Sequence, residues 1–313
     1  MVGLGAWQLG ADWGEVTEDA ALAVLSAAVD AGVTFIDTAD VYGDGRSEQL
    51  IGQFLKARPD AGLTVATKMG RRVPLEPAAY TLDNFRAWTD RSRANLGMDT
   101  LDLVQLHCPP TVVYSDDAVF DALDTLVQDG RVAAYGVSVE TRAEALAAIA
   151  RPGVASVQII LNLLRLGPLA EVLPAARAAG VGIIARVPLA SGLLSGKYDE
   201  RTTFPTDDHR NYNRHGAAFD VGETFSGVDF ATGLEAVRRL APLVPPEATM
   251  AQFALRWIVD QPGVSVVIPG ARNPRQARNN AAAADLAPLS DDALRTVQAV
   301  YDELIAPQVA HRW

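Results

Sequence analysis

The chain has 313 residues, of which 49% are hydrophobic and 21% are charged, a composition typical of soluble globular proteins. Its net charge of −11 makes nucleic acids and anionic membrane surfaces poor partners, because the overall field repels them. No apolar run of about 18 residues and no basic leader is present, and Cys108 is the single cysteine. The sequence therefore predicts no membrane span, no signal peptide and no internal disulfide, which fits a cytoplasmic enzyme best.

Strand patterns and helix patterns alternate along the whole chain. Helices are expected to begin at N-cap residues such as Thr17 and to end before glycines such as Gly32. The expected strands are residues 2–6, 33–36, 63–67, 101–106, 132–137, 154–159, 181–187 and 264–268. The expected helices are residues 17–31, 46–56, 82–96, 116–128, 142–149, 169–179, 233–240, 250–258, 274–284 and 291–304.

Eight strand–helix units predict parallel strands joined by right-handed crossovers. Because no linker separates two halves, we expect one α/β domain over residues 1–313, a closed (β/α)8 TIM barrel rather than a doubly wound sheet. The helix at 291–304 would be an addition to the barrel. Residues 190–227, after the seventh strand, form a segment too long for an ordinary connection, which is typical of a lid, a binding loop or a poorly ordered segment.

Polar residues stand where the strands are expected to end, and these ends meet on one face of a closed barrel. Asp37 follows the second strand, with Tyr42 in the loop beyond it, Lys68 follows the third strand and His107 follows the fourth. Three further strands end at or near Ser138, Gln158 and Arg186.

The first four residues have a readable chemistry. A lysine ammonium beside a tyrosine favours the phenolate and lowers the phenol pKa from about 10. Asp37 can hold Lys68 in place, and His107 can hydrogen-bond a carbonyl oxygen. We expect Tyr42 to give a proton to a carbonyl as charge grows on its oxygen. With no nucleophile–base pair and no metal-ligand spacing, this set needs a hydride-carrying cofactor.

Each residue also has a simpler interpretation. Asp37 and Lys68 could be a structural ion pair at the barrel mouth, His107 could be a core histidine, and Tyr42 could be a packed loop aromatic. All four on three neighbouring strand units are much less easily explained by chance.

The segments around these residues resemble the aldo-keto reductase family over essentially the full chain. FIDTADVYGDGRSEQLIG is similar to the family signature, including Glu48 and Gly52, while TVATKMG and LDLVQLHCP resemble its lysine and histidine segments. The resemblance implies that Tyr42 is the general acid, that Lys68 and Asp37 tune it, and that His107 orients the carbonyl. It also implies hydride transfer from a nicotinamide cofactor to an aldehyde or ketone on a (β/α)8 barrel. Consistent with this, no G-x-G-x-x-G follows a strand.

The segment VVIPGARNPRQARNN, residues 266–280, predicts an anion site. A strand, a turn at Gly270 and a helix beginning at Pro274 bring backbone N–H groups together. Arg272, Arg275 and Arg278 recur there at every third residue, and arginine suits phosphate because its donors form a planar fork. The segment therefore indicates the 2′-phosphate of NADP, with ordinary solvated helix charges as the alternative.

The resemblance extends these expectations to the whole cofactor, NADP(H). It implies cofactor contacts from Ala6, Trp7, Asp37, Ser138, Gln158, Arg186, Pro188, Leu189, Ser191, Gly192, Lys197, Gly270, Arg272, Gln276, Asn279 and Asn280. Two positions depart from the family pattern, Val139 where asparagine is frequent and Arg186 where a tyrosine often stacks on the nicotinamide. We hypothesise that Arg186 stacks there or reaches the phosphates, with a strand-end arginine paired to a carboxylate as the alternative.

The family also carries an N-terminal hairpin that has no counterpart before Val2, so we expect the hairpin either to be missing or to be encoded upstream. The substrate is not readable. Candidate pocket residues are Trp7, Trp13, Cys108, Pro109 and the 202–227 segment, which holds His209, Arg210, Tyr212 and His215. This segment could bind a sugar or sugar phosphate, or its polar residues could simply be solvated.

Two functions follow from the sequence: an NADP-dependent carbonyl reductase or alcohol dehydrogenase, and a non-catalytic nicotinamide-binding subunit on the same fold. The intact set of Asp37, Tyr42, Lys68 and His107 favours the first.

Overall fold

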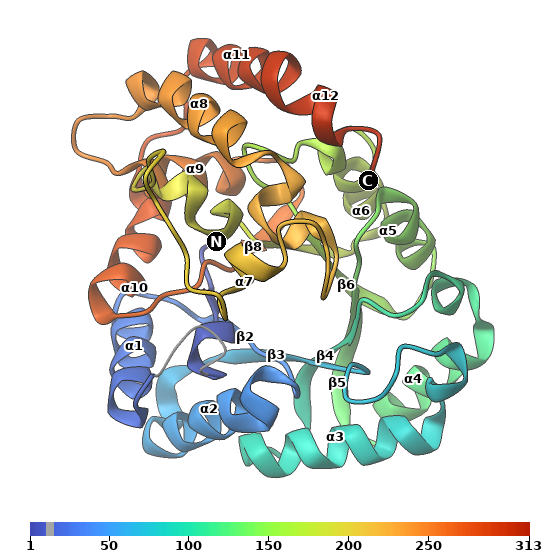
Figure 1. The fold of residues 1–313 in the computed structure, drawn as a ribbon. Coiled ribbons are helices and arrows are strands. Elements are labelled where there is room, and N and C mark those ends of the chain that lie inside the picture. The colour runs from blue at the N-terminus through green and yellow to red at the C-terminus, as the bar shows by residue number, and fades with distance from the viewer. Residues whose placement is uncertain (11–15) are drawn as a thin grey trace.

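The computed structural model describes residues 1–10 and 16–313, so Trp13, a predicted pocket residue, lies outside the described residues. The eight expected strands form one parallel sheet in the order β1 to β8, with helices around it (Figure 1). The predicted (β/α)8 barrel is confirmed. In the view of Figure 1 the segment after β7, which carries α7, overlies the opening of the barrel.

The strands are short and regularly spaced. Their bounds are β1 Leu4–Gly5, β2 Phe35–Asp37, β3 Thr64–Met69, β4 Leu101–His107, β5 Val132–Ser138, β6 Val154–Ile160, β7 Gly182–Arg186 and β8 Val264–Val267. The helices are α1 Glu18–Asp30, α2 Arg46–Ala57, α3 Leu82–Leu96, α4 Asp117–Gln128, α5 Arg142–Ile149, α6 Val172–Ala179, α7 His209–Tyr212, α8 Phe230–Leu240, α9 Met250–Val259, α10 Pro274–Ala281, α11 Asp291–Val300 and α12 Ala306–Val309.

The largest differences from the predicted elements lie at the two ends of the chain. Strand β1 has only two residues, because its contact with β8 consists of the isolated bridges Val2–Val267 and Gly5–Gly270. A Cβ on Gly5 would lie 2.8 Å from the carbonyl oxygen of Ile268, so the close approach that closes the barrel requires glycine there. The single last helix predicted over 291–304 is divided by a π turn between α11 and α12.

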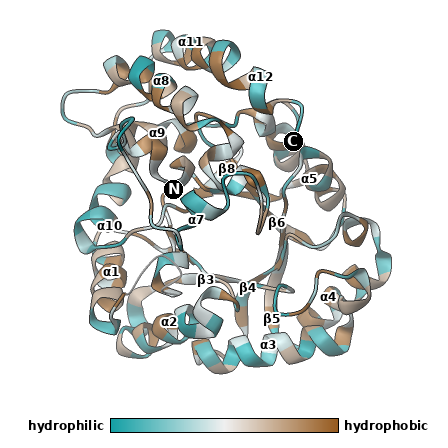
Figure 2. Cartoon of the chain, in the orientation of Figure 1, coloured by the Kyte–Doolittle hydropathy of each residue, from teal (hydrophilic) through white to brown (hydrophobic). Residues whose placement is uncertain are grey.

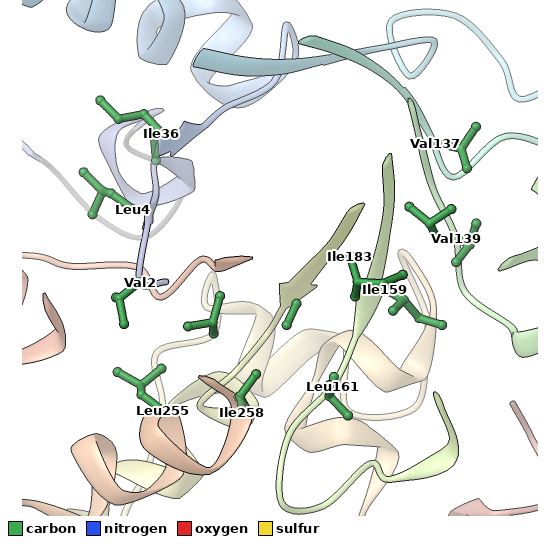
Figure 3. Close-up of a cluster of buried hydrophobic side chains, with 14 of the residues drawn as sticks. Val2, Leu4, Ile36, Val137, Val139, Ile159, Leu161, Ile183, Leu255 and Ile258 are labelled. Atoms are coloured by element: carbon green, nitrogen blue, oxygen red, sulfur yellow. The ribbon is translucent and has the colours of Figure 1, made fainter. Parts of the chain in front are cut away.

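The core has two parts that follow from the alternation of side chains along each strand. Inside the barrel, Ala66, Leu103, Ile184, Val266 and Ile268 pack together and fill one end. The outward-facing strand residues pack against the helices, as Figure 3 shows for residues in or next to β1, β2, β5, β6 and β7 and for two residues of α9. The helices carry hydrophilic as well as hydrophobic residues along their length (Figure 2). None of the helices in the described ranges is long and apolar enough to cross a membrane.

Helix α2 follows the Tyr42 loop, and its Gly52 is pressed against the C-terminal end of α3. A Cβ on Gly52 would lie 2.4 Å from the carbonyl oxygen of Asn95 and 2.9 Å from that of Leu96. We expect Gly52→Ala to lower the free energy of unfolding by about 1–3 kcal/mol, because overpacking outweighs the gain of about 1 kcal/mol in helix propensity. Urea denaturation measures this. Lys56→Ala, at an exposed position of α2, is the control, and a stabilised Gly52→Ala protein would contradict the packing argument.

Candidate active site

A polar layer replaces the apolar core where the strands reach the open end of the barrel. Register places Lys68 of β3 beside Gln105 of β4, and Ser138 of β5 beside Gln158 of β6. Asp37, at the end of β2, receives hydrogen bonds from three side chains of this layer. Its Oδ1 accepts from Lys68 Nζ (2.5 Å), and its Oδ2 accepts from Gln158 Nε2 (2.7 Å) and Gln105 Nε2 (3.1 Å).

The side chain of Lys68 is almost completely buried, with 1% of its surface exposed. Its ammonium group also donates to the carbonyl oxygen of Thr38 (2.8 Å) and to the Tyr42 hydroxyl (3.3 Å). All three protons of the ammonium group therefore have acceptors, which a buried charge requires. The interactions with Asp37 and Tyr42 raise the pKa of Lys68 despite its burial, so it stays charged.

Tyr42 stands on a tight turn, η2 (Tyr42–Gly45), in which Gly43 and Gly45 have positive φ. A Cβ on Gly43 would lie 2.2 Å from the carbonyl oxygen of Gly10, so the turn needs glycine there. Arg72 and Arg91 bind Asp44 of this turn and the backbone carbonyl of Asp40. The turn holds the Tyr42 ring 6.0 Å from the Trp7 ring, nearly parallel to it.

The expected lowering of the Tyr42 pKa is not the net result. Burial raises the pKa of Tyr42, and although Lys68 acts in the opposite direction, Asp37 adds to the increase. Lys68 does lower the Tyr42 pKa, as expected from the sequence, but desolvation is the larger effect and reverses the net direction. Tyr42 therefore carries its proton at neutral pH and can donate it.

The His107 ring lies 6.0 Å from the Tyr42 ring and is nearly perpendicular to it. Burial lowers the pKa of His107 well below its usual value, and Arg71, Lys68 and Arg186 lower it further. The ring is therefore neutral. The adjacent Cys108 donates its S–H to Ser138 Oγ (3.3 Å), and burial raises the pKa of this thiol to about 12, so it is no nucleophile.

One cavity of about 710 Å³ joins these residues to the predicted cofactor positions. Every predicted cofactor residue lines this cavity, namely Ala6, Trp7, Asp37, Ser138, Gln158, Arg186, Pro188, Leu189, Ser191, Gly192, Lys197, Gly270, Arg272, Gln276, Asn279 and Asn280. Tyr42 and His107 also line it, while Lys68 lies behind them. In the 202–227 segment His209 and Arg210 line the cavity, unlike Tyr212 and His215. In the described ranges, no group of histidine, cysteine and acidic residues is arranged to hold a metal ion.

The end of the cavity near α10 has the chemistry of a phosphate site. Asn273 is the N-cap of α10, and its Oδ1 accepts a hydrogen bond from the backbone N–H of Gln276 (2.9 Å). The Gln276 Oε1 accepts one from the backbone N–H of Arg272 (2.7 Å). Arg272 and Arg275 line the cavity, whereas Arg278 on the same helix does not. A Cβ on Gly270 would lie 2.2 Å from the amide end of the Gln8 side chain, so glycine lets Gln8 pack against this wall of the cavity. These residues fit a dinucleotide carrying an extra phosphate.

Arg186 forms ion pairs with two carboxylates, which was the alternative interpretation of this residue. It binds Glu223 of the 202–227 segment and Glu140 after β5 (2.8 Å), and its Nη2 also donates to the carbonyl oxygen of Val139 (3.1 Å). Burial raises the pKa of Glu140, against the effect of Arg186. Arg186 still lines the cavity, so its contact with a cofactor stays a prediction.

Three further residues of the site, Gln105, Glu140 and Glu223, were not predicted from the sequence. Gln105 could have been found, because it is a polar residue in an apolar strand, two positions before His107 and therefore on the same face. Glu140 and Glu223 carried no local signal, since only the fold brings residues so far apart in the chain to Arg186.

Asp40, two residues before Tyr42, is a fully buried acid. Neither of its carboxyl oxygens makes a hydrogen bond in the part of the chain that the structure describes. Burial raises the pKa of Asp40 to about 7, and Glu48 acts in the same direction, whereas Arg72, Arg91 and Lys68 oppose it. A neutral acid tolerates such a position better than a carboxylate does.

Comparison with known proteins agrees with this geometry. Residues 1–302 match the model of the aldo/keto reductase family. An uncharacterized oxidoreductase of Mycobacterium tuberculosis is 34% identical over 303 residues, covering 91% of this chain and 84% of the relative. A glycerol dehydrogenase structure from Gluconobacter oxydans is 30% identical, with a TM-score of 0.77 over 98% of this chain and 92% of that one. An aldo/keto reductase from Klebsiella pneumoniae, solved with NADP and acetate, shares the fold at 23% identity and a TM-score of 0.70, over 96% of this chain and 90% of that one.

The chain belongs to the aldo/keto reductase family, which places it among the oxidoreductases.

The buried Asp40 predicts a pH dependence of stability. The pKa of Asp40 in the folded protein, about 7, lies above the usual value of 3.8. The contribution of Asp40 to the free energy of unfolding is therefore fully present at low pH and is lost as the pH rises from about 4 through about 7. At pH 8, the free energy of unfolding of Asp40→Asn should therefore exceed that of wild type by about 1–3 kcal/mol. This difference should shrink as the pH is lowered toward about 4. Urea unfolding at pH 4.5, 6 and 8 measures the difference, and Asp60→Asn, at an exposed position, controls for the lost charge. If the difference in unfolding free energy between Asp40→Asn and wild type did not change with pH, ionisation of Asp40 could not be its cause.

Proposed function

We propose that this protein reduces an aldehyde or ketone to an alcohol, using NADPH as the hydride donor and Tyr42 as the proton donor. The observation that carries the proposal is the position of the Lys68 ammonium group, 2.5 Å from Asp37 and 3.3 Å from the Tyr42 hydroxyl, directly behind these two residues, which line one large cavity. A structural ion pair alone needs neither a tyrosine beside it nor a cavity in front of it.

The proton transfer follows from the electrostatics of these side chains. As the carbonyl π bond breaks, negative charge grows on its oxygen, and the Tyr42 O–H proton moves to that oxygen. The charge left on the Tyr42 oxygen is stabilised by Lys68, which stays protonated because Asp37 lies on its other side. Before the reaction, burial keeps Tyr42 in its protonated form.

His107 has a separate role at the same oxygen. As a neutral ring at the cavity wall, it can offer an N–H to the carbonyl without adding a charge. A second donor beside Tyr42 fixes the orientation of the carbonyl and favours the charge that develops in the transition state.

The cofactor proposal rests on the form and chemistry of the cavity. It runs from Tyr42 and His107 past the β7 end to the arginines at α10, and its volume of about 710 Å³ lies in the range of small-molecule and cofactor sites. When bound, NADPH supplies the hydride that no side chain of the site can supply. The segment 187–198 would hold the pyrophosphate, and Arg272 with Arg275 would hold the 2′-phosphate. The Klebsiella reductase, of the same fold, was solved with NADP.

The substrate is proposed to be small and polar. The carbonyl end of the cavity combines the aromatic rings of Trp7 and Phe219 with the charged groups of Arg71, Arg186 and Glu223. Such a mixture suits a hydroxylated carbonyl compound, and the 30% identical relative from Gluconobacter is a glycerol dehydrogenase. Sugar-like carbonyl compounds are therefore among the substrates to test first.

Tyr42→Phe tests the acid. We expect kcat for NADPH-dependent aldehyde reduction to fall by about a hundredfold or more, because general acid catalysis is lost, while the NADPH Kd measured by fluorescence changes little. The exposed Tyr212→Phe is the matched control. An unchanged kcat in Tyr42→Phe would contradict the assignment, and a wild-type protein that binds NADPH but turns over no aldehyde would favour the non-catalytic subunit.

Arg272→Ala tests the phosphate site. The substitution should raise the Kd for NADPH by about tenfold or more and leave the Kd for NADH nearly unchanged, because only NADPH carries the 2′-phosphate that the guanidinium would bind. Arg278→Ala removes the same charge from outside the cavity and should affect neither. Equal weakening of both cofactors by Arg272→Ala would place Arg272 elsewhere on the dinucleotide.

A further inference from the structure

Arg71 is a cation at the carbonyl end of the cavity to which the proposed reaction assigns no role. It follows Gly70, whose φ of +107° turns the chain at the end of β3. A Cβ on Gly70 would meet the Tyr80 ring at 3.1 Å, so this turn favours glycine twice over. The turn brings Arg71 beside His107, where its Nε donates to the His107 carbonyl oxygen (2.9 Å).

The rest of the Arg71 guanidinium group makes one long ion pair, with Glu140, and no hydrogen bond within the described ranges. Its Nη2 lies 3.8 Å from Glu140 Oε1, beyond hydrogen-bonding distance, and neither Nη1 nor Nη2 has a hydrogen bond within the described ranges. The side chain is 25% exposed and lines the cavity. By contrast, the ammonium group of Lys68 donates to Asp37, Thr38 and Tyr42, and both terminal nitrogens of Arg186 donate to carboxylate or carbonyl oxygens of the protein.

The open donors of Arg71 suit an oxygen acceptor. A guanidinium fork binds oxygen atoms in its own plane, and a hydrogen bond from a charged donor is stronger than one between neutral groups. Arg71 is bound to the backbone of His107 and lines the same cavity as His107 and Tyr42. An oxygen atom held by Arg71 would therefore lie near a carbonyl bound between His107 and Tyr42.

The charges around Arg71 favour a neutral ligand over a carboxylate. Glu140 lies beside Arg71, and Glu223 lines the same end of the cavity, where both pair with Arg186. Positive and negative side chains are already balanced there, so a carboxylate substrate would add an unpaired negative charge in a partly desolvated site. A hydroxyl or a second carbonyl adds none.

We propose that Arg71 is a specificity-determining residue whose guanidinium group binds an oxygen atom on the carbon next to the substrate carbonyl. The preferred substrates are then small, neutral aldehydes or ketones with an α-hydroxyl or α-carbonyl group. This inference rests on the proposed reductase activity. The reaction is the one given above, in which the carbonyl carbon receives the hydride and the carbonyl oxygen receives the Tyr42 proton.

The test compares two aldehydes of nearly equal size, glycolaldehyde and propanal, which differ by a hydroxyl in place of a methyl group. We expect wild type to favour glycolaldehyde, and Arg71→Met to lower kcat/KM for glycolaldehyde by about ten- to a hundredfold while changing that for propanal by less than about threefold. The hydrated fraction of each aldehyde is the same for every variant, so it cancels when the ratio of the two values is compared between variants.

Further variants separate substrate binding from a structural role. If Arg71 only supported the His107 backbone, Arg71→Met would lower kcat/KM for both aldehydes by the same factor. Any result in which the ratio of kcat/KM for glycolaldehyde to that for propanal is the same in Arg71→Met as in wild type would overturn the proposal. Arg71→Lys keeps the charge without the fork and should retain part of the preference, and it replaces Arg71→Met if the latter fails to fold. Arg58→Met, in an exposed ion pair with Asp30, is the control for loss of an arginine and should leave both rates unchanged.

Glyoxylate and cofactor binding complete the test. Wild type should use glyoxylate less well than glycolaldehyde, and a preference for glyoxylate that disappears in Arg71→Met would assign the residue to carboxylates and overturn the neutral class. If wild type reduces other aldehydes but none of these three compounds, this inference fails and the reductase activity stands; if it binds NADPH but reduces no aldehyde or ketone, the reductase activity fails and this inference fails with it. If wild type reduces these aldehydes but the ratio of kcat/KM for glycolaldehyde to that for propanal does not depend on Arg71, only this inference is overturned and the proposed reductase activity stands.

Discussion

The buried ion pair between Lys68 and Asp37 is the interaction on which the candidate site depends. Two charges removed from water are tolerable only when their remaining hydrogen-bonding capacity is used, and here the barrel supplies every partner. Gln105 and Gln158 donate to Asp37 from two further strands, and Thr38 and Tyr42 accept from Lys68. The pair therefore requires the barrel, because the two charges come from β2 and β3 and their partners from β4, β6 and the segment that follows β2.

A second group of charges connects the long segment after β7 to the barrel. Arg186, at the end of β7, binds Glu140 after β5 and Glu223 in the long segment, while Ser191 Oγ donates to the Glu223 carbonyl oxygen (2.8 Å). His209 Nε2 lies 3.3 Å from the same Ser191 Oγ. These contacts explain how a segment without strands holds a definite place at the cavity, and they place its residues along the path proposed for the cofactor.

The two ends of the cavity differ in how their charges are used. At α10, Arg272 and Arg275 line the wall at the start of a helix, an arrangement that attracts a phosphate. At the carbonyl end, the cations are matched by Asp37, Glu140 and Glu223. The field there suits a neutral substrate. The proposed role of the Arg71 donors is therefore to select substrates by their oxygen atoms and not to attract anions in general. Burial keeps both Tyr42 and His107 uncharged in this surrounding.

The sequence by itself determined the eight strand–helix units, the barrel and the four residues that we propose as a proton-donating site, because hydrophobic periodicity, glycine turns and polar residues at strand ends are local signals. Only the tertiary structure decided which distant groups meet. Gln105 joins Asp37 through strand register, Glu140 and Glu223 reach Arg186 across more than thirty-five residues of chain, and Arg71 comes beside His107 through the turn at Gly70. The net pKa of Tyr42 was also out of reach, since desolvation depends on how completely the folded chain encloses the ring, and no local pattern encodes that enclosure.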